Sequence, residues 1–173
     1  MTTDLSNTYG EMERLYNDSR VVKRAHFSAA QGKQRARTII GLAIIALNVL
    51  ISSSLIDVLV ADKAAVLIRI LAVFAAAFAA IQTFFNFQKD VEAHHSAGDA
   101  YGSINRRVRL LVAEFKDGSR KPDDIIADFK ALTEEYLKAN TRSKGCIPTD
   151  RDYYKARAAI ERSDDREGRV GSI

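Results

Sequence analysis

Hydrophobic residues are concentrated in two uncharged runs of nineteen residues each. The first run lies between Arg37 and Asp57, and the second lies between Arg69 and Lys89. As α-helices, with a rise of about 1.5 Å per residue, the runs extend roughly 28 Å, close to the ~30 Å hydrocarbon core of a bilayer. The pattern therefore predicts a transmembrane hairpin made of two helices and a short outer connector: residues 38–60, 66–88 and 61–65.

The composition of the runs favours a membrane over the core of a soluble bundle. The first run holds eleven Leu, Ile or Val residues, which contribute roughly −3 to −7 kcal/mol toward insertion. The second run holds nine Ile, Leu, Val or Phe residues and six alanines, so it is the weaker span. A soluble helix normally has a polar stripe, and neither run has one. A long charged segment precedes the first run and no small-residue cleavage site follows it, which argues against a signal peptide.

Outside the runs, apolar residues repeat every three or four positions, which is the period of an amphipathic helix. The pattern predicts a helix over residues 1–37 that leads into the membrane, and a second span that continues unbroken into a helical region over residues 89–162. Pro122 stands at a predicted helix start and Thr149 at a predicted N-cap. Residues 163–173 are polar and predict a flexible tail. No period-two pattern predicts a strand, so the expected fold is an all-α membrane protein with extended helices and a small C-terminal helical region.

Basic residues favour the outer flanks of the hairpin. Nine Lys or Arg residues lie within about twenty residues of the two runs on that side, whereas the connector side has two. The positive-inside rule then places both termini in the cytoplasm. The residues that set this topology are those nearest the membrane: Lys33, Arg35, Arg37 and Lys89. The net charge of +4 is small, and no aromatic residues alternate with Lys and Arg, so nucleic acid is not an expected partner.

Catalytic chemistry is not expected. The single Cys146 excludes an internal disulfide and has no neighbouring base in the sequence. His94 and His95 are adjacent, so on a helix they point about 100° apart and cannot chelate one ion together. His26 approaches one of them only if the helix extensions pack side by side, and a polar helix contact is the favoured interpretation. The sequence therefore predicts a protein that is not an enzyme, with no catalytic residue, cofactor or metal.

Polar residues inside the runs are the candidate functional residues, because polar groups in hydrocarbon face a partner or water. Asn48 and Ser52 lie on one face of the first helix and, together with Thr38, either line a pore or form interhelical hydrogen bonds. Two hydrophobic helices cannot enclose a water path, so conduction requires a homo-oligomer. The second run carries the candidate helix-packing residues, which are small or polar: Ala72, Ala76, Ala80, Gln82, Thr83 and Asn86.

The chain resembles the SLATT-domain family over roughly residues 12–160. The residues that carry the resemblance are Ala25-His26-Phe27, the segment Gln82-Thr83-Phe84-Phe85-Asn86-Phe87, His94 or His95, Ala97, Tyr101, Arg106-Arg107, Pro148, Asp152-Tyr153 and Ala156. Members of this family are two-transmembrane effectors associated with bacterial nucleotide-second-messenger and related defence systems, and they are proposed to form membrane pores.

The resemblance implies an oligomeric, pore-forming or membrane-disrupting effector of bacterial antiviral defence, in which the infected cell is sacrificed. It implies the bacterial inner membrane as the location and the lipid bilayer as a partner. The trigger is expected to come from a separate sensor or signalling protein, or from a nucleotide messenger. Two alternatives stay open at this point. One is a membrane-anchored adaptor whose cytoplasmic helices recruit a partner protein, and the other is a soluble helical bundle.

Overall fold

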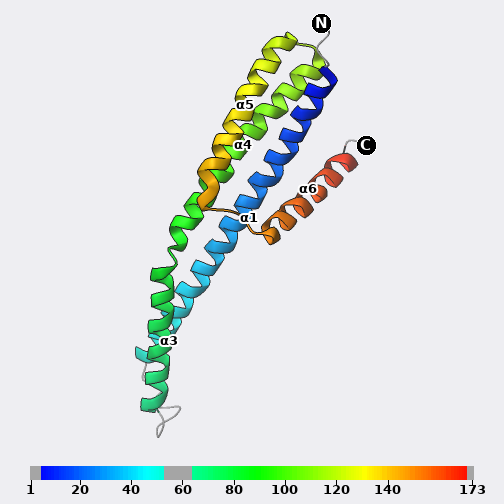
Figure 1. The fold of residues 1–173 in the computed structure, drawn as a ribbon. Coiled ribbons are helices and arrows are strands. Elements are labelled where there is room, and N and C mark those ends of the chain that lie inside the picture. Colours follow the sequence, from blue (N-terminus) through cyan, green and yellow to red (C-terminus); the bar gives the residue numbers. More distant parts are fainter. Residues whose placement is uncertain (1–4, 53–63, 171–173) are drawn as a thin grey trace. The chain divides into compact units, whose positions relative to one another are not determined.

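The structure, a computed structural model, describes residues 5–52 and 64–170, and these residues form helices with no strand among them (Figure 1). The elements are α1 (Leu5–Ser52), α3 (Ala64–Phe84), α4 (Phe87–Asp117), α5 (Pro122–Arg142), the 3-10 turn η1 (Ser143–Gly145) and α6 (Asp150–Val170). They form two compact units. The hairpin comprises residues 31–91, and the packed unit comprises residues 1–30 and 92–173. The predicted all-α class is confirmed.

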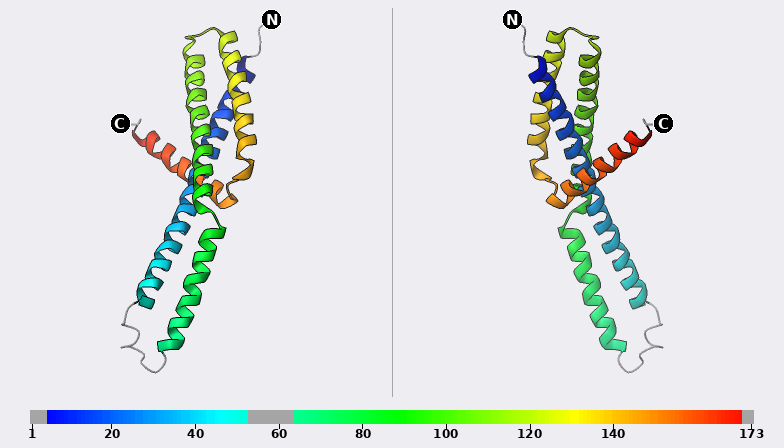
Figure 2. Two further views of the ribbon diagram at one scale, coloured as in Figure 1. Left: turned by 90° about the vertical axis from the view of Figure 1, so that its left-hand side faces the viewer. Right: turned by 90° about the vertical axis from the view of Figure 1, so that its right-hand side faces the viewer.

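The hairpin consists of the second half of α1 and all of α3, which lie side by side and antiparallel (Figure 2). Its large apolar side chains face outward: Ile39 is 67% exposed and Val73 is 69% exposed. Both helices are long and apolar enough to cross a membrane, and 0% and 6% of their most apolar stretches are buried. They are therefore not core helices of a soluble bundle. The predicted connector, residues 61–65, lies mostly outside the described residues.

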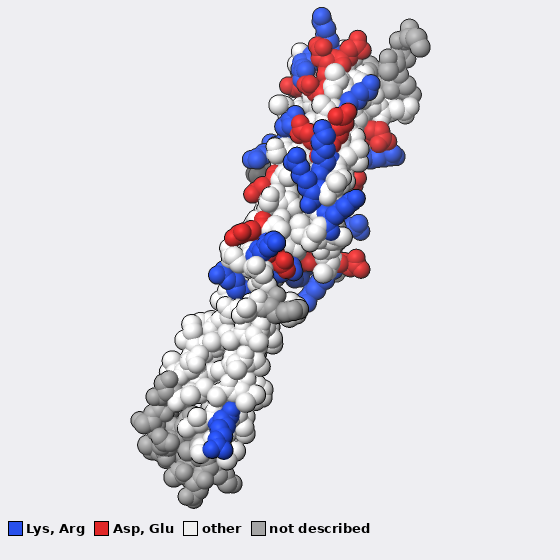
Figure 3. All heavy atoms as spheres, turned by 60° about the vertical axis from the view of Figure 1, so that its left-hand side comes forward, with Lys and Arg blue, Asp and Glu red and all other residues white. Residues whose placement is uncertain are grey.

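Charge separates the two units. On the face drawn in Figure 3, Lys, Arg, Asp and Glu side chains gather over one part of the molecule, and the part formed by the apolar stretches of α1 and α3 is almost uncharged. A surface of exposed Ile, Leu, Val and Phe without charges is unfavourable in water and favourable in lipid, because burial of apolar area is worth about 25 cal/mol per Å². The hairpin thus has the surface of a membrane-inserted element, and the predicted two-helix transmembrane hairpin is confirmed at the level of fold.

A break at Phe85 and Asn86 separates α3 from α4. The prediction of one unbroken second helix running through residues 66–88 and beyond is therefore wrong. The cause is Asn86, whose side-chain Oδ1 accepts a hydrogen bond from the backbone N–H of Lys89 at 3.2 Å. Asn is a favoured N-cap because its side chain satisfies a backbone donor that the first turn of a helix leaves unpaired. Asn86 begins a new helix, whereas its predicted interhelical role stays a prediction.

In the packed unit, the first half of α1 lies beside α4 and α5 (Figures 1 and 2). The predicted amphipathic faces meet there, and their apolar residues form the core: Met12, Leu15, Tyr101, Ile104, Val108, Leu111, Ile125, Leu132 and Ala139. Leu132 of α5 is only 1% exposed, which makes it a central member of this core. Burial of this kind, rather than intrinsic helix propensity, stabilises helices of this length.

A buried polar contact fixes the register of α1 against α4. The side-chain Nδ2 of Asn105 donates to the carbonyl oxygen of Tyr16 at 2.8 Å and contacts Oγ of Ser19 at 3.1 Å. Both Asn105 and Ser19 are buried. A buried amide without partners is costly, so sliding one helix along the other is opposed by the loss of both hydrogen bonds.

α6 starts at the predicted N-cap. The backbone N–H and the hydroxyl of Thr149 both donate to Oδ2 of Asp152, at 3.2 and 2.6 Å. The helix then continues to Val170, so part of the segment predicted as a flexible tail, residues 163–173, is helical, and its flexibility stays a prediction. The physical reason lies on α1, where the guanidinium of Arg20 donates two hydrogen bonds to the carboxylate of Asp164 and holds this end of α6 against α1.

Candidate functional site

The polar residues predicted inside the hairpin bond within their own helices. Three of them donate to the carbonyl oxygen four positions earlier: Thr38 to Gln34 at 3.0 Å, Asn48 to Ile44 at 2.9 Å and Thr83 to Ala79 at 2.9 Å. All three side chains are exposed on the hairpin surface. Local bonds of this kind lower the cost of carrying a polar side chain into lipid. They also leave the carboxamide of Asn48 facing outward, where a water path or a second copy of the chain can meet it.

The role of the predicted helix-packing residues of α3 stays a prediction. Ala72, Ala76, Ala80 and Gln82 are all exposed. Their small side chains leave a smooth strip that allows another helix to approach closely. The side chain of Ser52, the remaining predicted pore residue, lies outside the described residues.

The topology-setting residues lie where the hairpin ends. Nζ of Lys33 forms an ion pair with Oδ2 of Asp90 at 2.7 Å, and the guanidinium of Arg37 donates to Oε1 of Gln88. These contacts link the start of α4 to α1 within the hairpin. Arg35 and Lys89 are exposed, which leaves their charges available to phospholipid headgroups. The geometry agrees with an interfacial position for this end.

The packed unit contains a buried pair of histidines. Nδ1 of His26 on α1 lies 3.1 Å from Nδ1 of His94 on α4, and the two residues are only 2% and 1% exposed. The ring of His26 stacks on Tyr101, with 5.4 Å between centroids. The neighbouring His95 is exposed, and the centroid of its ring lies 5.7 Å from the centroid of the Phe27 ring. The side-by-side packing considered from the sequence is thus realised, and His94 is the partner.

Gly98 allows α1 and α4 to approach this closely, whereas the contact at Gly102 is an ordinary one. A Cβ atom added to Gly98 would lie 3.0 Å from the ring of Phe27, which is tighter than ordinary contact. One added to Gly102 would meet the side chain of Lys23 at 3.5 Å. Gly98 follows His94 by one helical turn, so the space that it leaves empty is filled by α1 immediately beside the histidine pair.

Cys146 joins the pair from a third segment of the chain. It follows η1, and its Sγ and the ring nitrogens of His26 and His94 all lie within 4.8 Å of one another. The hydroxyl of Tyr101 donates to Oδ1 of Asn140 at 2.7 Å and lies 3.0 Å from Oγ of Ser143, which positions the end of α5 beside the cluster. The sequence analysis missed this arrangement, because nothing local in the sequence relates Cys146 to either histidine.

Burial determines the protonation of the cluster. Burial, and to a smaller extent the nearby His94, lower the pKa of His26 from 6.5 to about 4. His26 is therefore a neutral imidazole at neutral pH. Burial also raises the pKa of Tyr101, while its hydrogen bond with Ser143 lowers it and Cys146 raises it.

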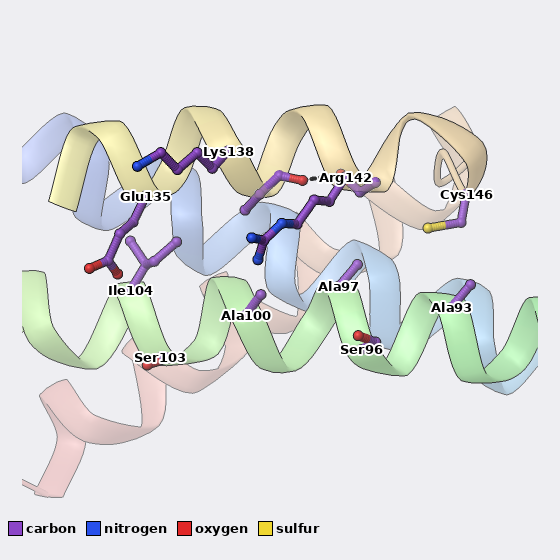
Figure 4. A pocket seen from close by; sticks show the side chains of 12 residues that line it. Ala93, Ser96, Ala97, Ala100, Ser103, Ile104, Glu135, Lys138, Arg142 and Cys146 are labelled. Atoms are coloured by element: carbon purple, nitrogen blue, oxygen red, sulfur yellow. Dashed lines mark hydrogen bonds between the residues drawn. The ribbon is translucent and has the colours of Figure 1, made fainter. Parts of the chain in front are cut away.

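A cavity of about 520 Å³ lies between α4 and α5 and reaches Cys146 (Figure 4). Small residues line it on α4, among them Ala97 and Ala100, and Lys138 and Arg142 line it on α5. Figure 4 shows the guanidinium of Arg142 lying in the space between the two helices. Among the described residues Arg142 forms no ion pair. The carboxylate of Glu135 lines the cavity as well, so its wall on α5 carries two basic residues and one acidic residue. The cavity is large enough for a small ligand.

Comparison with known proteins gives one match. The model of the SMODS and SLOG-associating 2TM effector domain family 4 matches residues 12–168. No curated protein and no solved structure matches the chain. The family model covers the packed unit and the hairpin together, and the two transmembrane segments in its description correspond to the two apolar helices α1 and α3. The resemblance stated from the sequence is confirmed.

Proposed function

The chain belongs to the SMODS and SLOG-associating 2TM effector domain family, and we propose that it is an oligomeric pore-forming or membrane-disrupting effector. We place it in the inner membrane of a bacterium, in an antiphage system that kills the infected cell when a separate sensor signals. The observation that carries this proposal is the hairpin itself, whose two apolar helices expose their large side chains and present the carboxamide of Asn48 outward.

Several copies are needed for conduction. Two helices cannot surround a water path, and α1 and α3 are the long apolar helices that the described part of the hairpin supplies. The exposed strip of Ala72, Ala76 and Ala80 supports helix contact between copies, because small residues let backbones approach closely. A closed ring of hairpins would bring the Asn48 side chains of neighbouring copies around one axis. In that arrangement Asn48 lines the path and the apolar residues face lipid.

The proposed orientation has both termini in the cytoplasm. Support comes from the basic flank residues, of which Lys33 and Arg37 are held at one end of the hairpin by Asp90 and Gln88. Cytoplasmic loops carry an excess of Lys and Arg. The packed unit then lies in the cytoplasm, where it can receive the signal from a sensor.

We propose that the signal acts on the packed unit by binding and that the unit performs no catalysis. The cavity beside α5 is the candidate site for a direct anionic messenger, since Lys138 and Arg142 line it. Charge-assisted hydrogen bonds from arginine suit phosphate groups. Titration of the full chain with a cyclic dinucleotide tests this part: binding that Arg142→Ala weakens supports it, whereas equal binding by both proteins contradicts it.

Dye release from liposomes tests the effector proposal. The full chain is reconstituted with its sensor or messenger, and release is expected to depend on both. Asn48→Leu removes the outward carboxamide and is expected to reduce release strongly, whereas the control Asn48→Gln keeps an amide and is expected to retain it. Oligomeric protein that releases no dye under any trigger, or release that is equal in both variants, contradicts the proposal.

The second candidate is a membrane-anchored adaptor. It is favoured by large apolar side chains on the surface of the packed unit, where Ile147 is 73% exposed and Tyr154 is 75% exposed. Replacing both spans by unrelated transmembrane helices separates the candidates. An adaptor keeps its activity after the replacement, because only anchoring is required of its spans, whereas the proposed effector loses it.

A further inference from the structure

The buried cluster in the packed unit has the geometry of a metal site. In a tetrahedral site with Zn–N distances of about 2.0–2.1 Å, two ligand nitrogens lie roughly 3.3 Å apart. The Nδ1 atoms of His26 and His94 are 3.1 Å apart, and Sγ of Cys146 lies within 4.8 Å of the ligand nitrogens. We propose that His26, His94 and Cys146 bind a divalent transition metal ion of the zinc class.

The donor set selects the class of metal. The cluster offers two imidazole nitrogens and one sulfur and includes no carboxylate among the described residues. Thiolate and imidazole ligands suit Zn²⁺ and related transition metals, whereas Ca²⁺ and Mg²⁺ require oxygen ligands. Mg²⁺ is therefore the appropriate negative control ion.

The protonation states permit binding with a simple proton balance. In the metal-free pair, one of the two Nδ1 atoms carries a hydrogen and directs it at the other. When both Nδ1 atoms bind the metal, that ring changes its tautomer and carries its hydrogen on Nε2. Neither imidazole therefore loses a proton overall. The thiol of Cys146 releases one proton to solvent as its sulfur binds the metal.

The surroundings orient one ligand, His26, and leave room for a fourth. Tyr101 stacks on His26 and is itself held by hydrogen bonding to Asn140 and Ser143, so the imidazole is oriented before a metal arrives. Cys146 also lines the cavity between α4 and α5. Water, or a donor atom of a molecule in that cavity, can complete a tetrahedral set of three protein ligands and one exchangeable ligand.

A metal ion bound at this site would join three segments that are far apart in the sequence. His26 belongs to α1, His94 to α4 and Cys146 to the segment between η1 and α6. A metal that binds the folded unit and not the unfolded chain stabilises the folded unit by mass action. This inference does not depend on the pore activity of the hairpin, and its test uses no activity measurement.

Metal titration of the full chain in detergent micelles tests the site. Zn²⁺ is titrated against a chromophoric chelator, and Co²⁺ is added separately to detect a thiolate-to-metal charge-transfer band. We expect one ion per chain, and an affinity that falls about tenfold or more in His94→Gln and Cys146→Ser. His95→Gln is the matched control, because His95 is the adjacent exposed histidine of the same helix, and it is expected to bind like the wild type. Absence of binding by the wild type, or equal binding by all four proteins, overturns the proposal.

A second measurement needs no variant and so does not depend on variant folding. Cys146 is the only cysteine, so the rate at which a thiol reagent modifies the chain reports on this sulfur alone. Zn²⁺ is expected to slow the modification about tenfold or more, and Mg²⁺ is expected to leave it unchanged. A rate that Zn²⁺ does not change overturns the proposal, even if variants bind metal weakly.

Discussion

The hairpin and the packed unit share one long helix, α1, yet their apolar side chains are arranged in opposite ways. In the packed unit apolar side chains turn inward, and Leu132 and Val108 are almost fully buried. In the hairpin the large apolar side chains turn outward, and polar groups such as that of Asn48 bond to their own backbone. The difference shows that one continuous helix can suit water along one part of its length and lipid along another. The side chains of each part determine which environment is favourable.

The strongest test of this contrast places a charge on each surface. Ile45 of the hairpin is 61% exposed and Leu110 of the packed unit is 59% exposed. Ile45→Asp is expected to cost about 3 kcal/mol of membrane insertion, whereas Leu110→Asp is expected to leave insertion unchanged. Extraction of isolated membranes with alkaline carbonate measures the difference. Equal extraction of the two variants would show that the hairpin surface does not face lipid.

Removal of core volume should affect only the packed unit. Leu132→Ala is expected to lower its free energy of unfolding by about 2–5 kcal/mol. Leu137 on the same helix is 58% exposed, so Leu137→Ala serves as control with an expected change within about 0.5 kcal/mol. All six tyrosines belong to the packed unit, and near-UV circular dichroism during urea unfolding therefore follows this unit alone. Similar losses in both variants would contradict the described core.

The buried His26 makes the packed unit sensitive to acid. Its pKa is about 4 in the folded protein and near 6.5 when unfolded, so the unfolded chain binds the extra proton first. Stability is therefore complete above pH 6.5 and falls between pH 6.5 and 4, by on the order of 2 kcal/mol. Urea unfolding of metal-free protein at several pH values measures this slope. His26→Gln should flatten it and His95→Gln should not, and an unchanged slope in His26→Gln would exclude His26 as its source.

The smallest effect is expected at the exposed ion pair of the hairpin. Lys33 and Asp90 are 2.7 Å apart, and their side chains are 37% and 54% exposed. Exposed pairs contribute about 0–1 kcal/mol, so Asp90→Asn should change thermal stability little and should leave insertion intact. A loss of insertion in this variant would give the pair a role in topology that its exposure does not predict.

The sequence predicts the hairpin well because a lipid environment leaves few alternatives to an apolar helix of this length. The amphipathic faces of α1, α4 and α5 are predicted for a related reason, since burial of one face requires a regular period. The break at Asn86 is not predicted by the sequence. An amide side chain near the end of an apolar run can form either an interhelical hydrogen bond or the N-cap of a new helix. The extended α6 depends on the pairing of Arg20 with Asp164, which are 144 positions apart.

The histidine–cysteine cluster could not be predicted from the sequence. His26 and His94 are 68 positions apart, and their meeting depends on the register that Asn105 and Gly98 set between α1 and α4. Cys146 arrives only because α5 returns along α4 and η1 turns the chain at its end. Each step depends on packing rather than on a local motif, so residue spacing does not predict the cluster.

Membrane topology is the most direct test of the account, and reporter fusions measure it. Alkaline phosphatase, which is active outside the cytoplasm, is inserted after Lys63, between the two apolar helices. In a second protein, green fluorescent protein, which folds in the cytoplasm, follows Val170. The account predicts an active phosphatase in the first and fluorescence in the second, because both apolar helices cross the bilayer. An inactive phosphatase after Lys63, in a chain that is produced at a normal level, would contradict it.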